Sequence, residues 1–361
     1  MPANSFSNGG YEKVSLLDEF DENENCFNNT SVTETKTNGN HTYNFEFSPA
    51  DFGVTKNGHI PDTKVEMYPE KFFEDDPKFP KEKRKLLFAF LAMVGGFIIN
   101  DVSIVLTHQK VPDKQLHPPL PDIMLDNVTK VRWLNDVADI LVILSILLSV
   151  SIVALHRHRW ILCRRVFLLL AMLYSFRSVT MYVTVLPLAN DHVYCSPKMS
   201  ESLSIGQKIL TIAEEVLKLL QSGGLPITGK KTMCGDYIYS GHTIILMMAN
   251  LLVSEYIPKR YNLLHWMSWI TAWIGMICLL VSHGHYTIDV IVGYYTTTRL
   301  FWIYHTFSNH TDLKIRSSAN SLSNIWWFRA FQYFEVNVSG KLPKEYSISR
   351  LRRRIQTFSS R

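Results

Sequence analysis

Two histidines and one carboxylate, each at the start of a hydrophobic segment, are the residues of this chain best suited to chemistry. His242 lies in the sequence SGHT, and His285 and Asp289 lie in the sequence HYTID. Histidines exchange protons near neutral pH, and an oriented imidazole can act as a nucleophile. A histidine pair of this kind can attack and protonate a phosphodiester. Its position beside hydrophobic segments predicts that the phosphate belongs to a lipid.

The spacing of His285 and Asp289 predicts their roles. Residues four positions apart on a helix share one face, with Cβ atoms about 5–6 Å apart. A carboxylate there can accept a hydrogen bond from one imidazole nitrogen and leave the other nitrogen basic. We therefore expect His285 to attack phosphorus and His242 to protonate the departing alcohol, a contribution of typically about 10²–10⁴-fold in rate. Because His285 must be uncharged to attack, activity is expected to fall at acid pH.

The start of each segment also predicts an anion site. Ser240 is a good helix N-cap, and Gly241 lets a ligand approach the backbone closely. Helices that begin here and near Tyr286 would aim free amide N–H groups at one layer, where a phosphate could bind. A metal site is the weaker alternative, because neither Cys234 nor Asp236 has a zinc-binding spacing and helix N-termini favour anions. We expect no metal and no cofactor.

Arg177 is the charged residue nearest the middle of a predicted membrane segment. An ionised side chain at that depth costs at least about 2.5–3.5 kcal/mol on insertion scales, which makes it a candidate functional residue. Arg177 could bind the phosphate, or it could form a structural ion pair with Asp101. The sequence leaves both options open.

The elements that must position these residues are membrane helices. Of the 361 residues 47% are hydrophobic, and they concentrate between residues 86 and 306 in blocks near the 20 or so residues that cross a bilayer. This predicts an all-α integral membrane protein with a disordered cytosolic region (1–80), a six-span catalytic domain (81–306) and a cytosolic tail (307–361). The six predicted spans are Leu86–Thr107, Val137–Leu155, Val166–Leu186, Gly241–Ile257, Leu263–Val281 and Tyr286–Tyr304.

Lysine and arginine predict the orientation. Basic clusters precede the first span, follow the second, separate the fourth from the fifth and occur in the tail, which places these segments and both termini in the cytosol. His242, His285 and Asp289 would then face the lumen or the exterior. Cys195 and Cys234 share that oxidising side, where a disulfide and two free thiols are both open. The net charge of +5 suits flanks beside anionic lipid, and no nucleic-acid-binding module occurs.

Several segments together resemble the sphingomyelin synthase family, a branch of the lipid phosphate phosphatase superfamily. The resemblance implies transfer of phosphocholine from phosphatidylcholine to the primary hydroxyl of ceramide, giving sphingomyelin and diacylglycerol. With His285 as nucleophile we expect a two-step transfer through a phospho-histidine, and a single in-line step with a histidine as general base stays open. It implies a catalytic triad of His242, His285 and Asp289. The Golgi and the plasma membrane are both open as locations, and a homodimer is left open as well. The segments that carry it include Pro119–Asp122 (PLPD), Arg177–Pro187 (RSVTMYVTVLP), Cys234–Thr243 (CGDYIYSGHT) and His285–Val290 (HYTIDV).

One position departs from the family pattern. Gly284 stands where relatives usually carry an acidic residue, just before His285. This leaves open whether the transferred headgroup is phosphocholine or phosphoethanolamine. A lipid phosphate phosphohydrolase, in which water replaces ceramide, is a further alternative, although the basic upstream phosphate motif of that class is not intact here. A six-span scaffold without activity would have no need of the two histidines.

Overall fold

The computed structural model describes residues 31–37, 40–46, 79–113, 117–189, 195–200, 202, 204–222, 233–317 and 320–346. The chain divides into two units, Met1–Phe72 and Phe73–Arg361. The first unit contains an antiparallel hairpin of β1 (Ser31–Thr37) and β2 (Asn40–Glu46). This hairpin falls inside the region predicted as disordered; the rest of that region, up to residue 78, lies outside the described residues, as does the predicted tail beyond residue 346.

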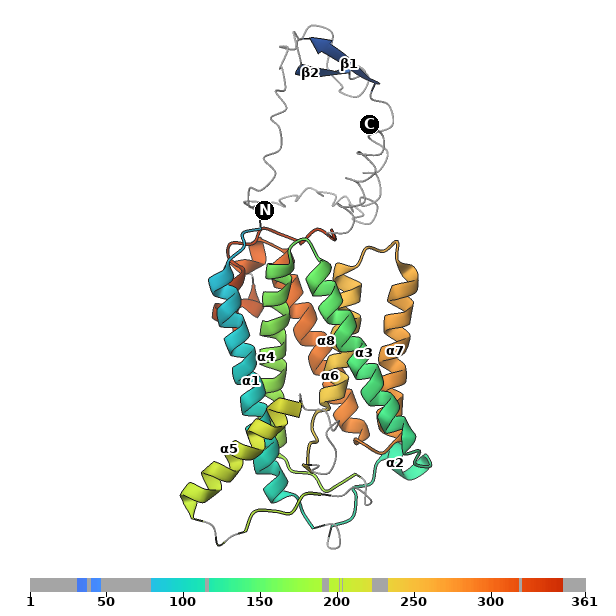
Figure 1. Ribbon diagram of the computed structural model, residues 1–361, viewed down its shortest axis with the longest axis vertical. Coiled ribbons are helices and arrows are strands. Elements are labelled where there is room, and N and C mark those ends of the chain that lie inside the picture. Colours follow the sequence, from blue (N-terminus) through green and yellow to red (C-terminus); the bar gives the residue numbers. More distant parts are fainter. Residues whose placement is uncertain are drawn as a thin grey trace, which may run out of the picture. The chain divides into compact units, whose positions relative to one another are not determined.

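The second unit is a bundle of long helices that stand side by side (Figure 1). Six of them correspond to the six predicted spans, with ends that differ by up to seven residues. They are α1 (Lys83–Lys110), α3 (Trp133–Leu155), α4 (Arg159–Val183), α6 (Gly241–Tyr256), α7 (Asn262–Val281) and α8 (Thr287–Asn309).

Four of these helices, α1, α3, α4 and α7, are long and apolar enough to cross a membrane. The other two do not meet that measure. Helix α6 has only 16 residues, and the polar groups of α8 include the Thr297–Thr298–Arg299 run. Both contact other helices of the bundle, α6 with α3, α7 and α8. A helix enclosed by protein can carry polar residues that a lipid-facing helix cannot.

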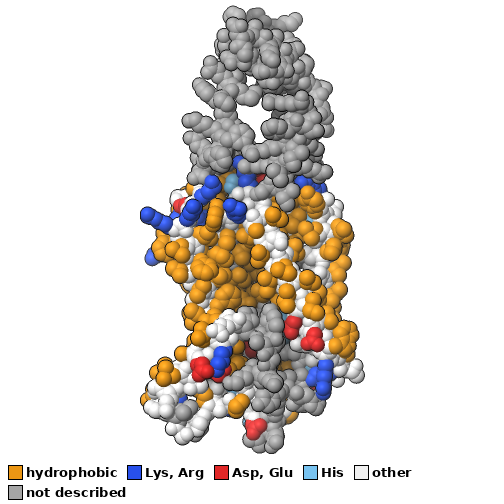
Figure 2. Space-filling view, in the orientation of Figure 1, with side chains coloured by type: hydrophobic (Ala, Val, Ile, Leu, Met, Phe, Trp, Pro, Cys, Tyr) orange, Lys and Arg blue, Asp and Glu red, His pale blue; other side chains and the backbone are white. Residues whose placement is uncertain are grey.

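The core of the bundle lies between α4, α6 and α8. Its largest cluster includes Leu169 and Leu173 of α4, Leu252 of α6 and Phe307 of α8, all at most 1% exposed. The outer faces are apolar as well, and Figure 2 shows hydrophobic side chains over the middle of the bundle with most of the visible Lys and Arg side chains gathered above them. Apolar side chains on both the inside and the outside are what a membrane bundle requires.

The segment after α8 folds onto one end of the bundle. It contains two short 3₁₀ helices, η3 (Asp312–Lys314) and η4 (Ser321–Asn324), and α9 (Phe328–Glu335). Phe328 and Phe331 of α9 join the main core cluster. Residues from 307 onward were expected to form a tail, so this packing was not predicted from the sequence.

Arg164 and Arg165 show where the prediction of the loop after the second span was wrong. They were placed in that loop, but α4 already begins at Arg159 and both side chains are 1% exposed. Arg165 Nη2 lies 2.7 Å from Oε2 of Glu335 in α9, and Arg164 Nη2 lies 3.4 Å from Oε1. Glu335 is itself fully buried. Arg164 also pairs with Glu82, with 2.9 Å between Nη1 and Oε2. The two arginines are therefore neutralised by two carboxylates far along the chain, which local charge patterns could not reveal.

Candidate active site

The structure brings His242 and His285 together. Helices α6 and α8 begin at the same end of the bundle, here called the histidine end, with His242 in the first turn of α6 and His285 two residues before α8. The ring centroids lie 6.0 Å apart with an interplanar angle of 62°. The His242 side chain is 24% exposed and that of His285 is 8% exposed, so the pair is reachable but largely enclosed.

Asp289 is fully buried and has two structural tasks besides its contact with His285. Its Oδ2 atom accepts a hydrogen bond from the Tyr286 amide at 3.0 Å, which caps α8, and its Oδ1 atom accepts one from the Ile238 amide at 2.9 Å. The carboxylate therefore fastens the loop before α6 to the start of α8. This explains why the short motif contains a carboxylate at the third position of the helix.

His285 is oriented toward this carboxylate at a longer distance. Its Nδ1 atom lies 3.5 Å from Oδ2 of Asp289 and makes no hydrogen bond in the described part of the chain. Catalytic hydrogen bonds without substrate are often long and tighten when substrate binds. A proton on Nδ1 that points to Asp289 leaves Nε2 as the basic nitrogen.

A second carboxylate, which was missed from the sequence, serves His242. Asp139 of α3 places its Oδ1 atom 2.9 Å from Nε2 of His242. Asp139 lies inside the predicted span 137–155, and a charged residue within a membrane segment is a signal that could have identified it. Each histidine thus has its own carboxylate partner. In this arrangement Nδ1 is the His242 nitrogen left for substrate chemistry.

Ser240 and Gly241 lie where α6 begins. The Ser240 hydroxyl oxygen accepts a hydrogen bond from the Thr243 amide at 3.4 Å, which confirms Ser240 as the N-cap. The Gly241 backbone lies against Arg177, since a Cβ atom there would be 3.6 Å from the guanidinium carbon. At α8 the amide N–H groups that were predicted to bind a phosphate are already occupied. The Tyr286 amide donates to Asp289, and the Thr287 amide donates to Asp122.

Arg177 is buried and bound to the same loop. Its guanidinium donates to the Tyr239 carbonyl at 2.7 Å and to Oδ1 of Asn100 at 2.6 Å, and it pairs with Asp236. Of the two alternatives left open by the sequence, the ion pair is present with Asp236 in place of Asp101, and Asp101 accepts a hydrogen bond from Asn100. Three of the five guanidinium N–H groups have protein acceptors. Arg177 thus holds the loop that ends at His242.

A disulfide between Cys195 and Cys234 fixes the other end of this loop and settles the open question of the thiols. Buried His108 in the last turn of α1 holds both sides of the bridge. Its Nδ1 atom accepts from the Cys234 amide at 3.0 Å, so Nε2 carries the proton and donates to the Ser196 carbonyl at 3.0 Å. His108 thereby attaches the bridge to α1, at a point two residues before Asp236 in the loop.

Asp122 connects a third segment to the start of α8. It caps α2 (Ile123–Asn127) and accepts hydrogen bonds from the Thr287 amide at 2.8 Å and the Thr287 hydroxyl at 2.6 Å. Burial acts to raise the pKa of this carboxyl, but the hydrogen bonds from Thr287, Met124 and Leu125 outweigh burial and hold it below its ordinary value. The segments that carried the family resemblance therefore meet around the two histidines.

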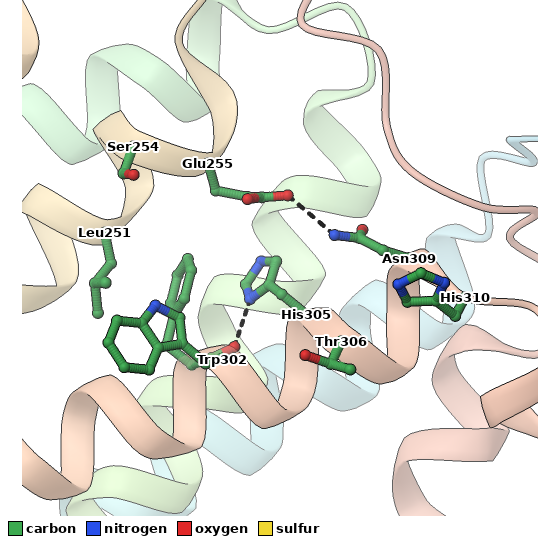
Figure 3. A pocket seen from close by; sticks show the side chains of 9 residues that line it. Leu251, Ser254, Glu255, Trp302, His305, Thr306, Asn309 and His310 are labelled. Atoms are coloured by element: carbon green, nitrogen blue, oxygen red, sulfur yellow. Dashed lines mark hydrogen bonds between the residues drawn. The ribbon is translucent and has the colours of Figure 1, made fainter. Parts of the chain in front are cut away.

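A pocket of about 220 Å³ lies at the other ends of α6 and α8 (Figure 3). Glu255 accepts a hydrogen bond from Asn309 there, and Trp302 and His305 line it from α8. Ser254 is 12 residues from His242, roughly 18 Å along a helix that rises 1.5 Å per residue. This pocket is therefore separate from the candidate active site.

Comparison with known proteins agrees with the arrangement. Residues 233–306, which contain both histidines and Asp289, match the model of the PAP2 superfamily C-terminal domain. The chain is 41% identical over 269 residues to phosphatidylcholine:ceramide cholinephosphotransferase 1 of Rattus norvegicus, covering 74% of this chain and 63% of the relative. It is 40% identical over 270 residues to phosphatidylcholine:ceramide cholinephosphotransferase 2 of Homo sapiens, covering 75% of this chain and 72% of the relative. The chain thus matches less than two thirds of the length of the type 1 relative.

Proposed function

Because the chain belongs to the phosphatidylcholine:ceramide cholinephosphotransferase family, we propose that it transfers phosphocholine from phosphatidylcholine to the primary hydroxyl of ceramide. The products are sphingomyelin and diacylglycerol. One observation carries this proposal at the level of chemistry: His242 and His285 are neighbours, and each faces its own carboxylate. Two oriented imidazoles suit a reaction in which one alcohol leaves phosphorus and another arrives.

The first half of the reaction uses His285 as the nucleophile. Its Nε2 lone pair attacks phosphorus, the bond from phosphorus to the diacylglycerol oxygen breaks, and His242 donates a proton to that oxygen. Asp289 accepts the Nδ1–H group of His285 and stabilises the positive charge that develops on the ring. The two rings, with centroids 6.0 Å apart, are close enough for both imidazoles to act on one phosphoryl group.

The second half reverses these roles. His242, now neutral, takes the proton of the ceramide hydroxyl, and the ceramide oxygen attacks phosphorus. The bond between phosphorus and His285 breaks, which restores the starting enzyme. A single in-line displacement with a histidine as general base would give the same products and is the alternative for the mechanism.

The proposed membrane arrangement has six spans, with α6 and α8 completing the set that α1, α3, α4 and α7 begin. The basic clusters and the docked α9 lie at the end opposite the histidines, and the positive-inside rule assigns that end to the cytosol. The histidine end then faces the lumen or the exterior, in the Golgi or the plasma membrane. A disulfide at the histidine end supports this assignment, since such bridges persist in oxidising compartments.

Gly284 is the residue that leaves the identity of the transferred headgroup, phosphocholine or phosphoethanolamine, to be decided by experiment. A Cβ atom at this position would lie 3.2 Å from Oδ1 of Asn135 and 3.4 Å from the Ser282 hydroxyl oxygen. An acidic side chain there would need Asn135 to move, so this chain differs from the family pattern beside His285 itself. Ceramide phosphoethanolamine synthesis is the alternative activity that this difference leaves open.

A transfer assay tests the function. Purified protein in nanodiscs would receive labelled ceramide with phosphatidylcholine or phosphatidylethanolamine, and products would be resolved by mass. Labelled sphingomyelin that disappears in His285→Ala is the expected result. Ceramide phosphoethanolamine alone would preserve the mechanism and change the donor. Phosphate released from a lipid phosphate, with no ceramide product, would identify a phosphohydrolase instead.

A further inference from the structure

Helix α5 (Ile205–Ser222) is an amphipathic helix outside the bundle of spans. Its sequence, IGQKILTIAEEVLKLLQS, puts apolar residues on one side of the helix and Gln, Lys and Glu residues on the other. Figure 1 shows α5 running obliquely beside the histidine end of α1, and α1 is an element against which it packs. This segment falls inside a region that was predicted to be loop.

Most of the apolar side of α5 is not covered by the described part of the chain. Val216 is buried, but larger side chains around it are open, including Ile205 at 78% and Leu210 at 71% exposed. The contact with α1 therefore leaves a row of apolar side chains without cover from described residues. These side chains are Ile205, Ile209, Leu210, Leu217 and Leu220.

The polar side of α5 is electrically balanced. Lys218 lies 2.6 Å from Glu214 and 3.3 Å from Glu215, and the Glu214 side chain is 65% exposed. With Lys208, the helix has two positive and two negative side chains. A helix with one strongly apolar side and one charged side fits the surface of a bilayer rather than its interior.

The segment that leads into α5 is held at the level where α1 ends. The Met199 amide donates to Oε1 of Gln109 at 2.8 Å, and Lys198 Nζ donates to the Val111 carbonyl at 2.7 Å. At this same level Lys110 Nζ lies 4.1 Å from the ring centroid of Tyr182. Lysine and tyrosine at the end of a span are typical of the boundary between lipid and water.

The neighbouring spans also expose apolar side chains near their histidine end. Val179 and Val183, in the last turns of α4, are 62% and 75% exposed, and α4 packs along α1. The disulfide between Cys195 and Cys234 closes the loop that contains α5 and attaches it to α1. A tether at both ends keeps α5 beside the bilayer surface.

We propose that α5 lies in the bilayer interface at the histidine end, with its uncovered apolar side chains at the boundary between headgroups and acyl chains. Its charged side faces water. Helices of this kind sink their apolar face about 5–10 Å into that boundary. The partner is thus a lipid surface. This inference rests on the membrane placement given with the proposed function, and it adds a lipid contact beside the histidines.

Depth-dependent fluorescence quenching tests the proposal. The full chain, with Cys26, Cys163 and Cys278 replaced by serine and the disulfide retained, would carry one cysteine labelled with an environment-sensitive fluorophore. Leu217→Cys reports the apolar side, and Glu214→Cys on the same helix is its matched control. The protein would be reconstituted at one copy per nanodisc, with spin labels on shallow or deep acyl-chain positions of the lipid.

The expected result is blue-shifted emission and strong shallow quenching at position 217, with little of either at position 214. A water-like signal at both positions would overturn the proposal. Blue-shifted emission at position 217 that appears only with two copies per nanodisc, without quenching by the labelled lipid, would also overturn it, because a second chain would then cover α5.

Two further measurements distinguish failure of the α5 proposal from failure of the membrane placement or of the proposed activity. Leu147→Cys, on the outer face of α3 where Leu147 is 57% exposed, should show deep quenching. If position 147 stayed unquenched, the membrane placement itself would fail. If position 217 were quenched as expected but ceramide transfer were absent in the same nanodiscs, the proposed activity would fail and the placement of α5 would stand.

Discussion

Asp139 of α3 and His242 of α6 form a contact of 2.9 Å between a carboxylate oxygen and an imidazole nitrogen. The two residues come from different helices, and α3 packs against both α6 and α7. The packing of α3 therefore determines the orientation of His242. It also selects the nitrogen that remains for the reaction, because Nε2 is occupied by Asp139.

Asp139→Asn should lower ceramide transfer by about 10–100-fold, part of the 10²–10⁴-fold that general acid catalysis typically supplies. The amide can keep the ring in place but cannot stabilise a charged imidazolium. The defect should shrink when the donor carries a nitrophenolate leaving group, which departs without a proton. Steady-state rates with both donors measure this. Asp136→Asn, one turn earlier and exposed, is the control, and an equal defect with both donors would contradict a role in proton donation.

His285→Ala should abolish transfer, because the nucleophile is lost. Omitting ceramide should let phosphocholine accumulate on His285 in the native enzyme, and mass spectrometry after rapid quenching detects it. No adduct under these conditions, together with normal turnover, would favour a single in-line step. Activity should also fall at acid pH, because a protonated His285 cannot attack phosphorus; a flat pH–rate profile would argue against a neutral nucleophile.

Arg177→Met should reduce the free energy of unfolding by about 1–3 kcal/mol, the usual cost of leaving a buried acceptor without its donor, because Asp236, the other member of the ion pair, is 40% exposed. It leaves Asp236 unpaired and the Tyr239 carbonyl without its donor. Thermal unfolding in detergent measures the loss. Arg299→Met is the control, because Arg299 lies exposed over the rings of Tyr295 and Trp302. Equal stability losses in the two variants would contradict the structural role of Arg177.

Replacing Cys195 and Cys234 by serine should cost about 4 kcal/mol if the bridge acts by loop closure over its 39-residue separation. Activity should fall as well, because the bridge leads directly into the loop that carries His242. Thermal unfolding and transfer rates, compared with a variant that lacks only Cys163 and Cys278, give both effects. A reductant that lowers the stability of the control as much as the double replacement does would support the bridge.

The lowered pKa of His156 leads us to expect that the protein loses thermal stability in weak acid. This fully buried residue follows α3, and burial, reinforced by the charge of His158, lowers its pKa from 6.5 to about 4. Between pH 6.5 and pH 4 the unfolded chain therefore binds a proton at His156 that the folded chain does not. The contribution of neutral His156 to the free energy of unfolding is fully present above pH 6.5 and is lost as pH falls toward 4. His156→Leu should reduce the drop in melting temperature between pH 7 and pH 5. His310→Leu, at an exposed position, should leave the drop unchanged.

The features that could be predicted from the sequence are those that depend on residues close together in the chain. His285 and Asp289 lie within one motif, and the apolar runs define the six long helices. Asp139 and Glu335 could not be assigned in the same way, since their partners lie more than 100 positions away and meet them only when helices pack. Helix α5 was readable from its amphipathic pattern but fell inside a region already counted as loop.

Asp289 has a consequence for mutational scanning of this protein. One carboxylate caps α8, holds the Ile238 amide and faces His285, so a variant there changes folding yield and turnover together. Abundance and activity scores should fall in parallel at position 289. At position 285, where Nδ1 makes no hydrogen bond within the described residues, they should separate, with normal abundance and no activity. A paired scan would thus sort the residues around the histidines into those that build the site and those that react.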